Sequence, residues 1–358
     1  MLTPEKMTKL ANNRIVDIYT ELNQKLTNEI IKQLKKDGDL SSYTKAQLKV
    51  LKKQGGLKIF FETLKSVQGI TKERKEELKE LFDEVAEEQF KGYKPQYDYS
   101  EVDYKLSNST RQMLDSVVRR TEKELKNMTK SVAFSTQKTY IQAIDDLYTK
   151  VISGGWDYER AMKSTLDDLT EKGITLEHDG RNYSLESSVK MNLFTSIKQT
   201  ADNISEQIKD DIGANAVWIA PTPYCRPSHR VINGVVMDLK EFKKHEYLTE
   251  EPNCYHIVNY VVKEAFEPPL SKKEINTMNN KADEVYKNRQ KQNYYARQVR
   301  QKKKEIASLG TSSKDVLKSK KTQLRNAQIK YRTFSQSKGL NVDYFQTWEA
   351  GYNANRNR

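Results

Sequence analysis

The chain has 358 residues, 31% of them charged, and a mean hydropathy of −0.86. A single domain usually has about 100 to 200 residues, so this length predicts two or three folded units. The low hydropathy favours long solvated helices, while 20 Tyr and 10 Phe supply enough apolar area to exclude wholesale disorder.

The composition also points to a protein that starts in a cytoplasm. No run approaches the ~20 apolar residues of a membrane span, so we expect no contact with a membrane. The first ten residues lack the charged start, apolar stretch and cleavage site of a secretory signal. Two cysteines are too few for the disulfide framework of a secreted domain, which fits a reducing compartment.

The net charge of +13 is confined to one segment. Residues 287–332 hold fifteen Lys and Arg against two acids, whereas the rest of the chain holds 47 basic and 47 acidic residues. A general basic bias would be spread evenly. The localised charge predicts a contact with nucleic acid or with an acidic partner, the other interpretation being a solvated helix face.

Residues 1–92 have the periodicity of helices. Asp37-Gly38 and Gly55-Gly56 are expected to break the run, and Thr71 to cap a helix over residues 72–90. These helices have apolar stripes without an evident core of their own, so we expect them to bury against another protein. Residues 93–109 contain Pro95 and several tyrosines without periodicity, which predicts a linker.

Residues 110–269 contain the convincing strands and predict a small central α+β domain. Asp157 is expected to cap a helix that ends at Gly173, and a hairpin over 174–185 turns at Asp179-Gly180. A helix over 186–212 and a buried strand over 216–220 follow. Asn233-Gly234 predicts a second hairpin, between strands 230–232 and 235–239. The fold class is therefore α+β and predominantly α.

Residues 270–338 predict a basic helical hairpin, followed by a tail over 339–358. The two helices are expected to turn at Gly310, with Ser312 capping the second. Arg289, Gln292 and Lys303 interrupt the apolar seam, so we expect a slender arm that needs a partner. The candidate DNA contacts are the basic residues of this arm: Arg297, Arg300, Lys302, Lys303, Lys304, Lys318, Lys320, Lys321 and Arg325.

Chemistry-bearing residues gather in one window of the central domain. Cys225, His229, Cys254 and His256 are all types that bind zinc, although their spacing matches no standard zinc finger. A Cys254 nucleophile with a histidine base is a further alternative. We favour a structural role, in which these side chains pack and hydrogen-bond to hold two loops together, with no catalytic residue, no metal and no cofactor.

Two short motifs carry a resemblance to a known family. Arg226-Pro227-Ser228-His229, followed by Asn253-Cys254-x-His256, resembles the pattern of the phage minor capsid protein 2 family, which looks related to Mu F-like head morphogenesis proteins. Flanking segments extend the likeness over about residues 128–340. Cys225 and Tyr255 depart from the family's usual small residue and arginine at these positions, and residues before Thr110 lie outside the likeness.

The resemblance implies a structural minor head protein of a tailed bacteriophage. Such a protein associates with the portal protein, and with major capsid or scaffolding protein, inside the head, after assembly in the host cytoplasm. The basic arm adds non-specific contact with double-stranded DNA. Rival interpretations are an enzyme or toxin-type effector that uses the Cys/His cluster, a zinc-stabilised nucleic-acid-binding protein, or a host nucleoid or RNA-binding protein. No phosphate-binding glycine loop, H-E-x-x-H or G-x-S-x-G motif supports an enzyme.

Overall fold

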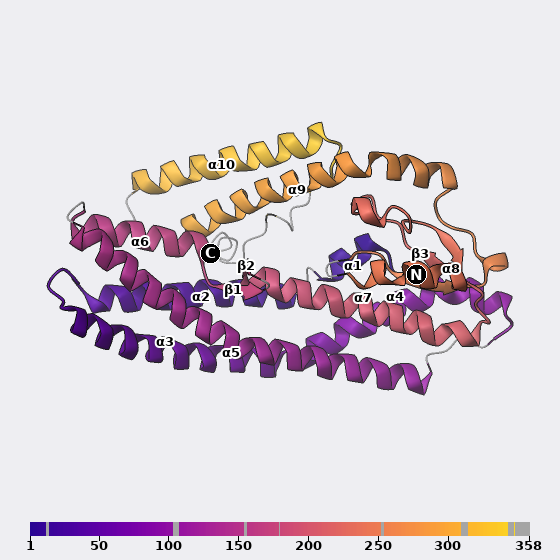
Figure 1. Cartoon of the computed structure of the whole chain (residues 1–358), viewed down its shortest axis with the longest axis horizontal. Helices are drawn as coiled ribbons and strands as arrows, with labels where there is room; N and C mark the ends of the chain where they lie inside the picture. The colour runs from indigo at the N-terminus through magenta and orange to yellow at the C-terminus, as the bar shows by residue number, and fades with distance from the viewer. Residues whose placement is uncertain are drawn as a thin grey trace. The chain divides into compact units, whose positions relative to one another are not determined.

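A computed structural model gives the fold of residues 1–11, 14–102, 107–153, 156–178, 180–251, 254–308, 314–342 and 347. Helices dominate this part of the chain, which also contains two small antiparallel sheets (Figure 1). The predicted class, predominantly α with a small β content, is confirmed.

The chain forms two compact units from alternating segments. Unit 1 comprises residues 1–13, 74–123 and 190–291, and unit 2 comprises residues 14–73, 124–189 and 292–358. Helices α5 (Asn108–Ile152), α7 (Leu185–Asp211) and α9 (Lys272–Ser308) contribute residues to both units. These units differ from the consecutive domains that we predicted from composition, because long helices carry the chain repeatedly from one unit to the other.

Unit 2 contains α2 (Arg14–Asp37), α3 (Lys45–Glu73) and α6 (Tyr158–Lys172). The apolar stripe of α2 is buried inside this unit, with exposed fractions of 0 to 2%. Its members recur at helical spacing: Ile15, Tyr19, Leu22, Leu26, Ile30 and Leu34. The N-terminal helices thus share a core with later segments of the same chain, and our expectation that this stripe is left for another protein is wrong.

Of the two helix breaks that we predicted at glycines in this region, one is present and the other is not. Helix α2 ends at Asp37, and Gly38 follows with a φ of +73°, as predicted. Gly55 and Gly56, however, lie within the unbroken helix α3. A Cβ at Gly55 would stand 2.0 Å from the hydroxyl oxygen of Tyr140. This glycine therefore does not break the helix; it leaves room for a side chain of α5 to pack closely against α3.

Helix α4 (Lys75–Tyr99) overturns the predicted linker over residues 93–99. The helix continues through Pro95 because its last turns are held by tertiary contacts that the local pattern does not reveal. Tyr93 and Tyr97 are buried, and Gln96 donates to the carbonyl of Ala265 at 2.9 Å. The expected cap at Thr71 is also wrong, since Thr71 lies inside α3 and α4 begins after Arg74.

Unit 1 is built on a three-stranded antiparallel sheet in the order β4-β3-β5. β3 (Ala216–Ile219) is central and pairs with β4 (Val236–Asp238) and β5 (Val258–Val261). The predicted strand over 230–232 is wrong, because a 3-10 helix, η1 (Pro227–His229), and a turn occupy this region. Asn233-Gly234 does form a turn, with Gly234 at φ +74°, but that turn leads into β4.

The remaining elements follow the predictions closely. Asp157 caps α6 by accepting from the Arg160 amide at 2.8 Å. β1 (Thr175–His178) and β2 (Arg181–Ser184) form the expected hairpin in unit 2, although Asp179 of its turn lies outside the described residues. Unit 1 also contains α1 (Pro4–Ala11), α8 (Leu239–Glu250) and η2 (Lys263–Ala265).

The basic hairpin predicted over residues 270–338 corresponds to α9 and α10 (Lys314–Ser337). Ala296 and Val299 of α9 form an apolar cluster with Leu324 and Tyr331 of α10. Gly310 and Ser312, where we expected the turn and the cap, lie outside the described residues. Among the helices that the structure describes, none combines the length and the apolar character needed to cross a membrane.

Candidate functional site

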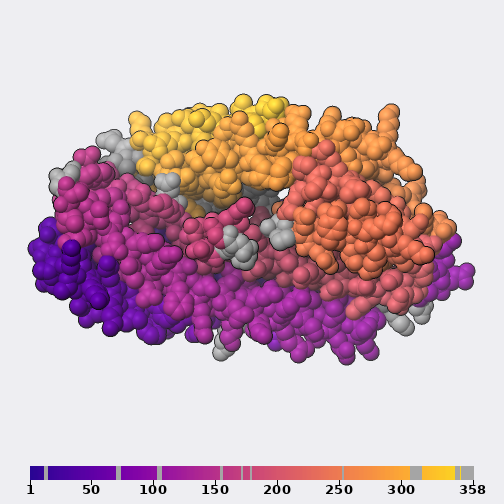
Figure 2. Space-filling model, in the orientation of Figure 1, coloured from indigo at the N-terminus to yellow at the C-terminus, as the bar shows by residue number. Residues whose placement is uncertain are grey.

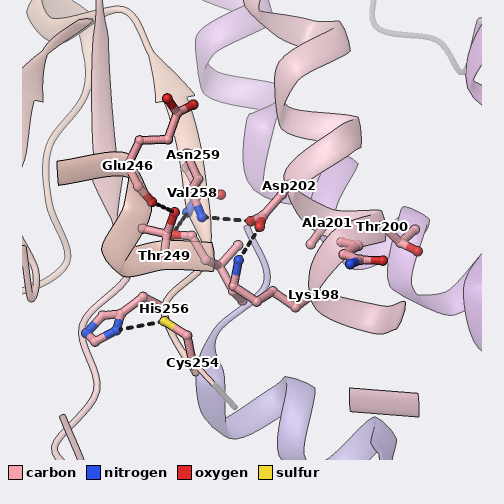
Figure 3. A network of polar contacts seen from close by, with 12 residues as sticks. Lys198, Thr200, Ala201, Asp202, Glu246, Thr249, Cys254, His256, Val258 and Asn259 are labelled. Atoms are coloured by element: carbon pink, nitrogen blue, oxygen red, sulfur yellow. Dashed lines mark hydrogen bonds and ion pairs between the residues drawn. The ribbon is translucent and has the colours of Figure 1, made fainter. Parts of the chain in front are cut away.

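Strand β5 is the element that positions the Cys/His cluster, and side chains of α4 and α7 hold its outer edge. The amides of residues 258, 260 and 262 donate to Asp202 at 2.9 Å, Ser205 at 2.7 Å and Gln96 at 2.8 Å. Figure 3 shows Asp202 directed at Val258, with Lys198 paired to the same carboxylate. The segment from Cys254 to Ile257, which enters β5, is thereby fixed against the helices.

The structure brings three of the four predicted zinc ligands together. Cys254 Sγ lies 3.4 Å from His256 Nδ1 and 3.7 Å from His229 Nδ1, and the two Nδ1 atoms are 3.5 Å apart (Figure 3 shows Cys254 and His256). His229 ends η1, whereas the other two precede β5. All three side chains are buried, with exposed fractions of 1 to 4%. The sulfur and the two inner ring nitrogens therefore converge on one point.

The outer ring nitrogens are held by acceptors. His229 Nε2 lies 2.9 Å from a Glu251 carboxylate oxygen, and Arg226 donates to that same oxygen at 2.7 Å. His256 Nε2 lies 3.1 Å from Asn233 Oδ1. Arg226, a residue of the predicted motif, thus positions the acid that orients His229. Pro227 and Ser228 are exposed in η1, and Asn253 lies outside the described residues.

The amide orientation of Asn233 is fixed by its surroundings. Its Oδ1 accepts from the Thr222 backbone amide at 2.8 Å, and its Nδ2 donates to Asn279 at 2.8 Å. Because Oδ1 is an acceptor here, His256 Nε2 must carry a proton. The same holds for His229 Nε2 opposite the Glu251 carboxylate. In their neutral forms both histidines therefore turn a lone pair at Nδ1 toward Cys254.

Cys225 is buried but not part of the convergent group. Its thiol donates to the Arg226 carbonyl at 3.1 Å. Together with His229, Cys254 and His256 it lines a cavity of about 170 Å³, whose wall also includes tyrosines 224, 255 and 286. The thiol stands beside the cluster without joining it.

Burial controls the ionisation of both cysteines and of His256. It raises the pKa of Cys254, and it raises that of Cys225 to about 12 with help from the neighbouring Cys254. Burial, followed by the charge of His229, lowers the pKa of His256 to about 3. The Cys254 thiol thus stays protonated at neutral pH. This state is opposite to that of a nucleophilic cysteine, which works as the thiolate.

The second predicted site, the basic arm, is divided by the structure into buried, paired and exposed groups. Lys303 is buried, and its ammonium donates to the Thr347 carbonyl at 2.6 Å. Lys302 and Lys320 both pair with Glu305, and Lys304 pairs with Glu186 of α7. Arg300 is half-buried. The run at 302–304, the densest basic run of the arm, is therefore mostly engaged within unit 2.

Most of the exposed basic residues that the structure describes on α10 form a single stripe, whereas Lys330 is exposed on another side of the helix. Lys318, Lys321, Arg325 and Arg332 are exposed and lie three, four and seven residues apart. At about 3.6 residues per turn this spacing places them within roughly 60° of one another around the helix axis. The surface of α10 is drawn in yellow in Figure 2. Arg297 of α9 is also exposed.

Comparison with protein families gives one match. The sequence model described as phage minor capsid protein 2 matches residues 2–336, nearly the whole chain. The chain belongs to the phage minor capsid protein 2 family. Comparisons with curated proteins and with solved structures gave no match. The protein is therefore a phage minor capsid protein, as the two motifs suggested, and the family extends to the N-terminal helices that our resemblance had left out.

Membership of the minor capsid protein 2 family does not reveal the residues that orient the cluster. Sequence reasoning missed Glu251 and Asn233, because each comes from a separate loop and neither belongs to a recognisable ligand spacing. Asn233 carried a signal that we assigned to turn formation alone. Asp202 and Ser205 were also missed, although polar residues on the buried and half-buried side of α7 could have indicated contacts with backbone amides.

Proposed function

We propose that the protein is a structural component inside the phage head that associates with the portal and contacts packaged DNA through α10. The observation that carries the DNA contact is the exposed basic stripe formed by Lys318, Lys321, Arg325 and Arg332. Family membership supports a place in the virion. Portal association rests on the family resemblance of the Arg226 and Cys254 motifs.

The charge distribution supports binding without sequence preference. Outside residues 287–332 the chain has equal numbers of basic and acidic residues, so a duplex gains little from the rest of the surface. Basic side chains that neutralise phosphates release condensed counterions, which strengthens binding at low salt whatever the base sequence. Within the arm, Lys302, Lys304 and Lys320 already face carboxylates, so α10 provides the principal surface.

The full chain carrying Lys318→Gln, Lys321→Gln and Arg325→Gln tests this proposal. We expect its affinity for duplex DNA to fall at least about tenfold at low salt, with a shallower dependence of binding on salt concentration. The measurement is a fluorescence anisotropy titration with two unrelated duplexes at several salt concentrations. Equal losses on both duplexes are expected, because phosphate contacts carry no sequence information.

A matched control removes the same charge from α3. Lys49, Lys53 and Lys65 are exposed there, and their triple replacement by Gln should leave most of the affinity in place. If the two triple variants bind DNA equally well, net charge rather than the α10 stripe governs binding. If the unaltered protein binds equally at low and moderate salt, the proposed DNA contact is wrong.

A further inference from the structure

Besides the basic stripe of α10, the convergence of His229, Cys254 and His256 in unit 1 also invites a function. Their inner donor atoms lie within 4.8 Å of one another and come from two loops that are far apart in sequence. A hydrogen-bonded cluster would distribute protons so that each buried acceptor meets a donor. The arrangement around these residues does not allow this with neutral side chains.

The cluster has fewer protons than its buried acceptors need. Glu251 and Asn233 Oδ1 both accept, so the Nε2 atoms of the two histidines carry the protons. Both Nδ1 atoms then have lone pairs, and they face each other at 3.5 Å. The single thiol proton of Cys254 can be donated to only one of these two nitrogens. One buried acceptor is left opposite another, an arrangement that a cation between them would resolve.

The distances agree with a tetrahedral metal ion. With bonds of ~2.0 to 2.1 Å to nitrogen and ~2.3 Å to sulfur, neighbouring ligand atoms of tetrahedral zinc lie roughly 3.3 to 3.6 Å apart. The three separations here are 3.4, 3.5 and 3.7 Å. The outer contacts also follow the usual pattern, in which a ligating histidine donates its other N–H to a carboxylate or carbonyl oxygen.

We propose that the protein binds one zinc ion through His229 Nδ1, Cys254 Sγ and His256 Nδ1, with the fourth position open to the neighbouring cavity. On binding, Cys254 loses its thiol proton to solvent and the thiolate becomes the anionic ligand. Two imidazole nitrogens and one thiolate form a ligand set that suits zinc in a reducing cytoplasm. Cys225 stays outside the set because its thiol is turned to the Arg226 carbonyl.

The ion would fasten η1 to the segment that enters β5. Arg226 and Glu251 support it from outside, since the carboxylate oxygen that orients His229 is itself held by the guanidinium. In this arrangement the motif that begins at Arg226 and the motif that contains Cys254 both contribute ligands to one metal centre. Glu251 acts as a positioning residue rather than a ligand.

Metal analysis of the full chain tests the proposal. The protein is purified without a polyhistidine tag, and zinc is measured by mass spectrometry for metals. We expect about one zinc per chain in the unaltered protein and at least a tenfold lower content in Cys254→Ser. Cys225→Ser and His245→Asn are the matched controls, one thiol beside the cluster and one histidine of α8, and both should keep their zinc.

Two further measurements keep the proposal testable if Cys254→Ser fails to fold. The unaltered protein loaded with cobalt should show a thiolate-to-cobalt charge-transfer band and the visible spectrum of a tetrahedral site. Glu251→Gln should retain the ligands but bind zinc about ten- to a hundredfold more weakly in a competitive titration. An unchanged affinity in this variant would contradict the positioning role of Glu251.

Other outcomes overturn the proposal in defined ways. If neither zinc nor cobalt binds when supplied in excess, the cluster is a hydrogen-bonded network without a metal and the proposal is wrong. If Cys225→Ser loses zinc as completely as Cys254→Ser, the fourth position is closed by that thiol rather than open. If the purified protein carries copper instead, the assignment to zinc is wrong.

Discussion

Glu186 is a half-buried carboxylate of unit 2 that pairs with Lys304 and accepts from Asn23 at 3.3 Å. Burial alone would raise its pKa, but the charges of Lys304 and Arg300 outweigh burial and lower the pKa from 4.5 to about 2. The folded protein therefore holds this proton less tightly than the unfolded chain does. The resulting stability is present above pH 4.5 and is lost as the pH falls toward 2.

Replacing Glu186 by Gln should remove this pH dependence. We expect the variant to be less stable at neutral pH, by on the order of 3 kcal/mol, and to lose less further stability between pH 4.5 and 2 than the unaltered protein. Thermal unfolding followed by circular dichroism across this range measures the difference. Glu21→Gln, at an exposed position of α2, is the control and should leave the profile unchanged.

Gly55 and Gly69 provide a second test at the level of single residues. Gly69→Ala in α3 meets no atom within 4 Å and should stabilise the helix by about 0.5 to 1 kcal/mol. Gly55→Ala in the same helix should instead destabilise by about 1 to 3 kcal/mol, because the new methyl group would collide with the Tyr140 ring. Tyr140 cannot easily move, since it is buried and donates to Asp37 at 2.8 Å.

Denaturant titration of the two glycine variants gives the sign of each change. Opposite signs are expected, although the substitution and the helix are the same. If Gly55→Ala proves as stable as the unaltered protein, the close passage between α3 and α5 is looser than the structure indicates.

At the scale of elements, strand β5 depends on side chains of neighbouring helices for its outer hydrogen bonds. Ser205→Ala removes the acceptor of the Tyr260 amide and the partner of the Tyr93 hydroxyl, both of which are buried. We expect a loss of about 1 to 3 kcal/mol, the usual consequence of leaving a buried polar group unsatisfied. Hydrogen exchange should show faster exchange of the Tyr260 amide.

The matched control for this loss is Ser116→Ala on α5. The Ser116 hydroxyl is exposed and donates only to the carbonyl of Gln112 in its own helix. The stability of unit 1 should therefore be almost unchanged. An equally small effect of Ser205→Ala would mean that water replaces the lost acceptor and that the edge of β5 is not sealed.

Local patterns predicted those elements that are stabilised by nearby residues. The cap at Asp157, the helix end at Gly38 and the hairpin of β1 and β2 depend on residues within a few positions, and all were predicted correctly. The failures at Gly55, at Pro95 and at residues 230–232 have one cause. In each, contacts with distant segments decide the structure, through Tyr140, through Gln96 and Tyr97, and through pairing of β4 with β3.

The candidate site shows the same division. The residue types and order of Cys225, His229, Cys254 and His256 suggested a cluster, and three of the four do meet. Their geometry could not be predicted, because it depends on Glu251 and Asn233, which lie on different loops. In the basic arm, charge was evident from the sequence, but burial of Lys303 and the ion pairs of its neighbours were not.

At the scale of the whole molecule, the proposed portal contact needs an apolar surface, and unit 2 has one. Val50, Leu57 and Phe61 of α3 have exposed fractions of 43 to 63%, and Phe134 of α5 is 59% exposed. The ring of Phe60 lies 5.4 Å from that of Phe61 and 4.9 Å from that of Phe134, so these three aromatic side chains form one patch across α3 and α5. Exposed apolar patches of this kind commonly mark protein interfaces.

We predict that the protein co-purifies with procapsids that lack DNA. The α10 stripe could follow DNA into a head, but it cannot explain incorporation before packaging. Phe61→Ser combined with Phe134→Ser should lower the amount in empty procapsids at least about tenfold without lowering the melting temperature. Quantitative mass spectrometry of purified procapsids measures it. Absence of the unaltered protein from these particles would contradict incorporation through the portal.

Tyr247→Ser provides the control for the procapsid experiment. Tyr247 is 62% exposed on α8 of unit 1, so its loss removes exposed aromatic surface outside the patch. Incorporation should then be unchanged. If this variant is lost from procapsids as fully as the double phenylalanine variant, the patch on α3 and α5 has no special role.

The sealed edge of β5 has a consequence for association between copies of this chain. An open strand edge is a template on which a second chain can add its own strand, and high local concentration favours such self-association. In unit 1 the three outward amides of residues 258, 260 and 262 are already bound, and β4 at the opposite edge is only three residues long. Copies that meet at high concentration therefore have little opportunity to polymerise through their sheets.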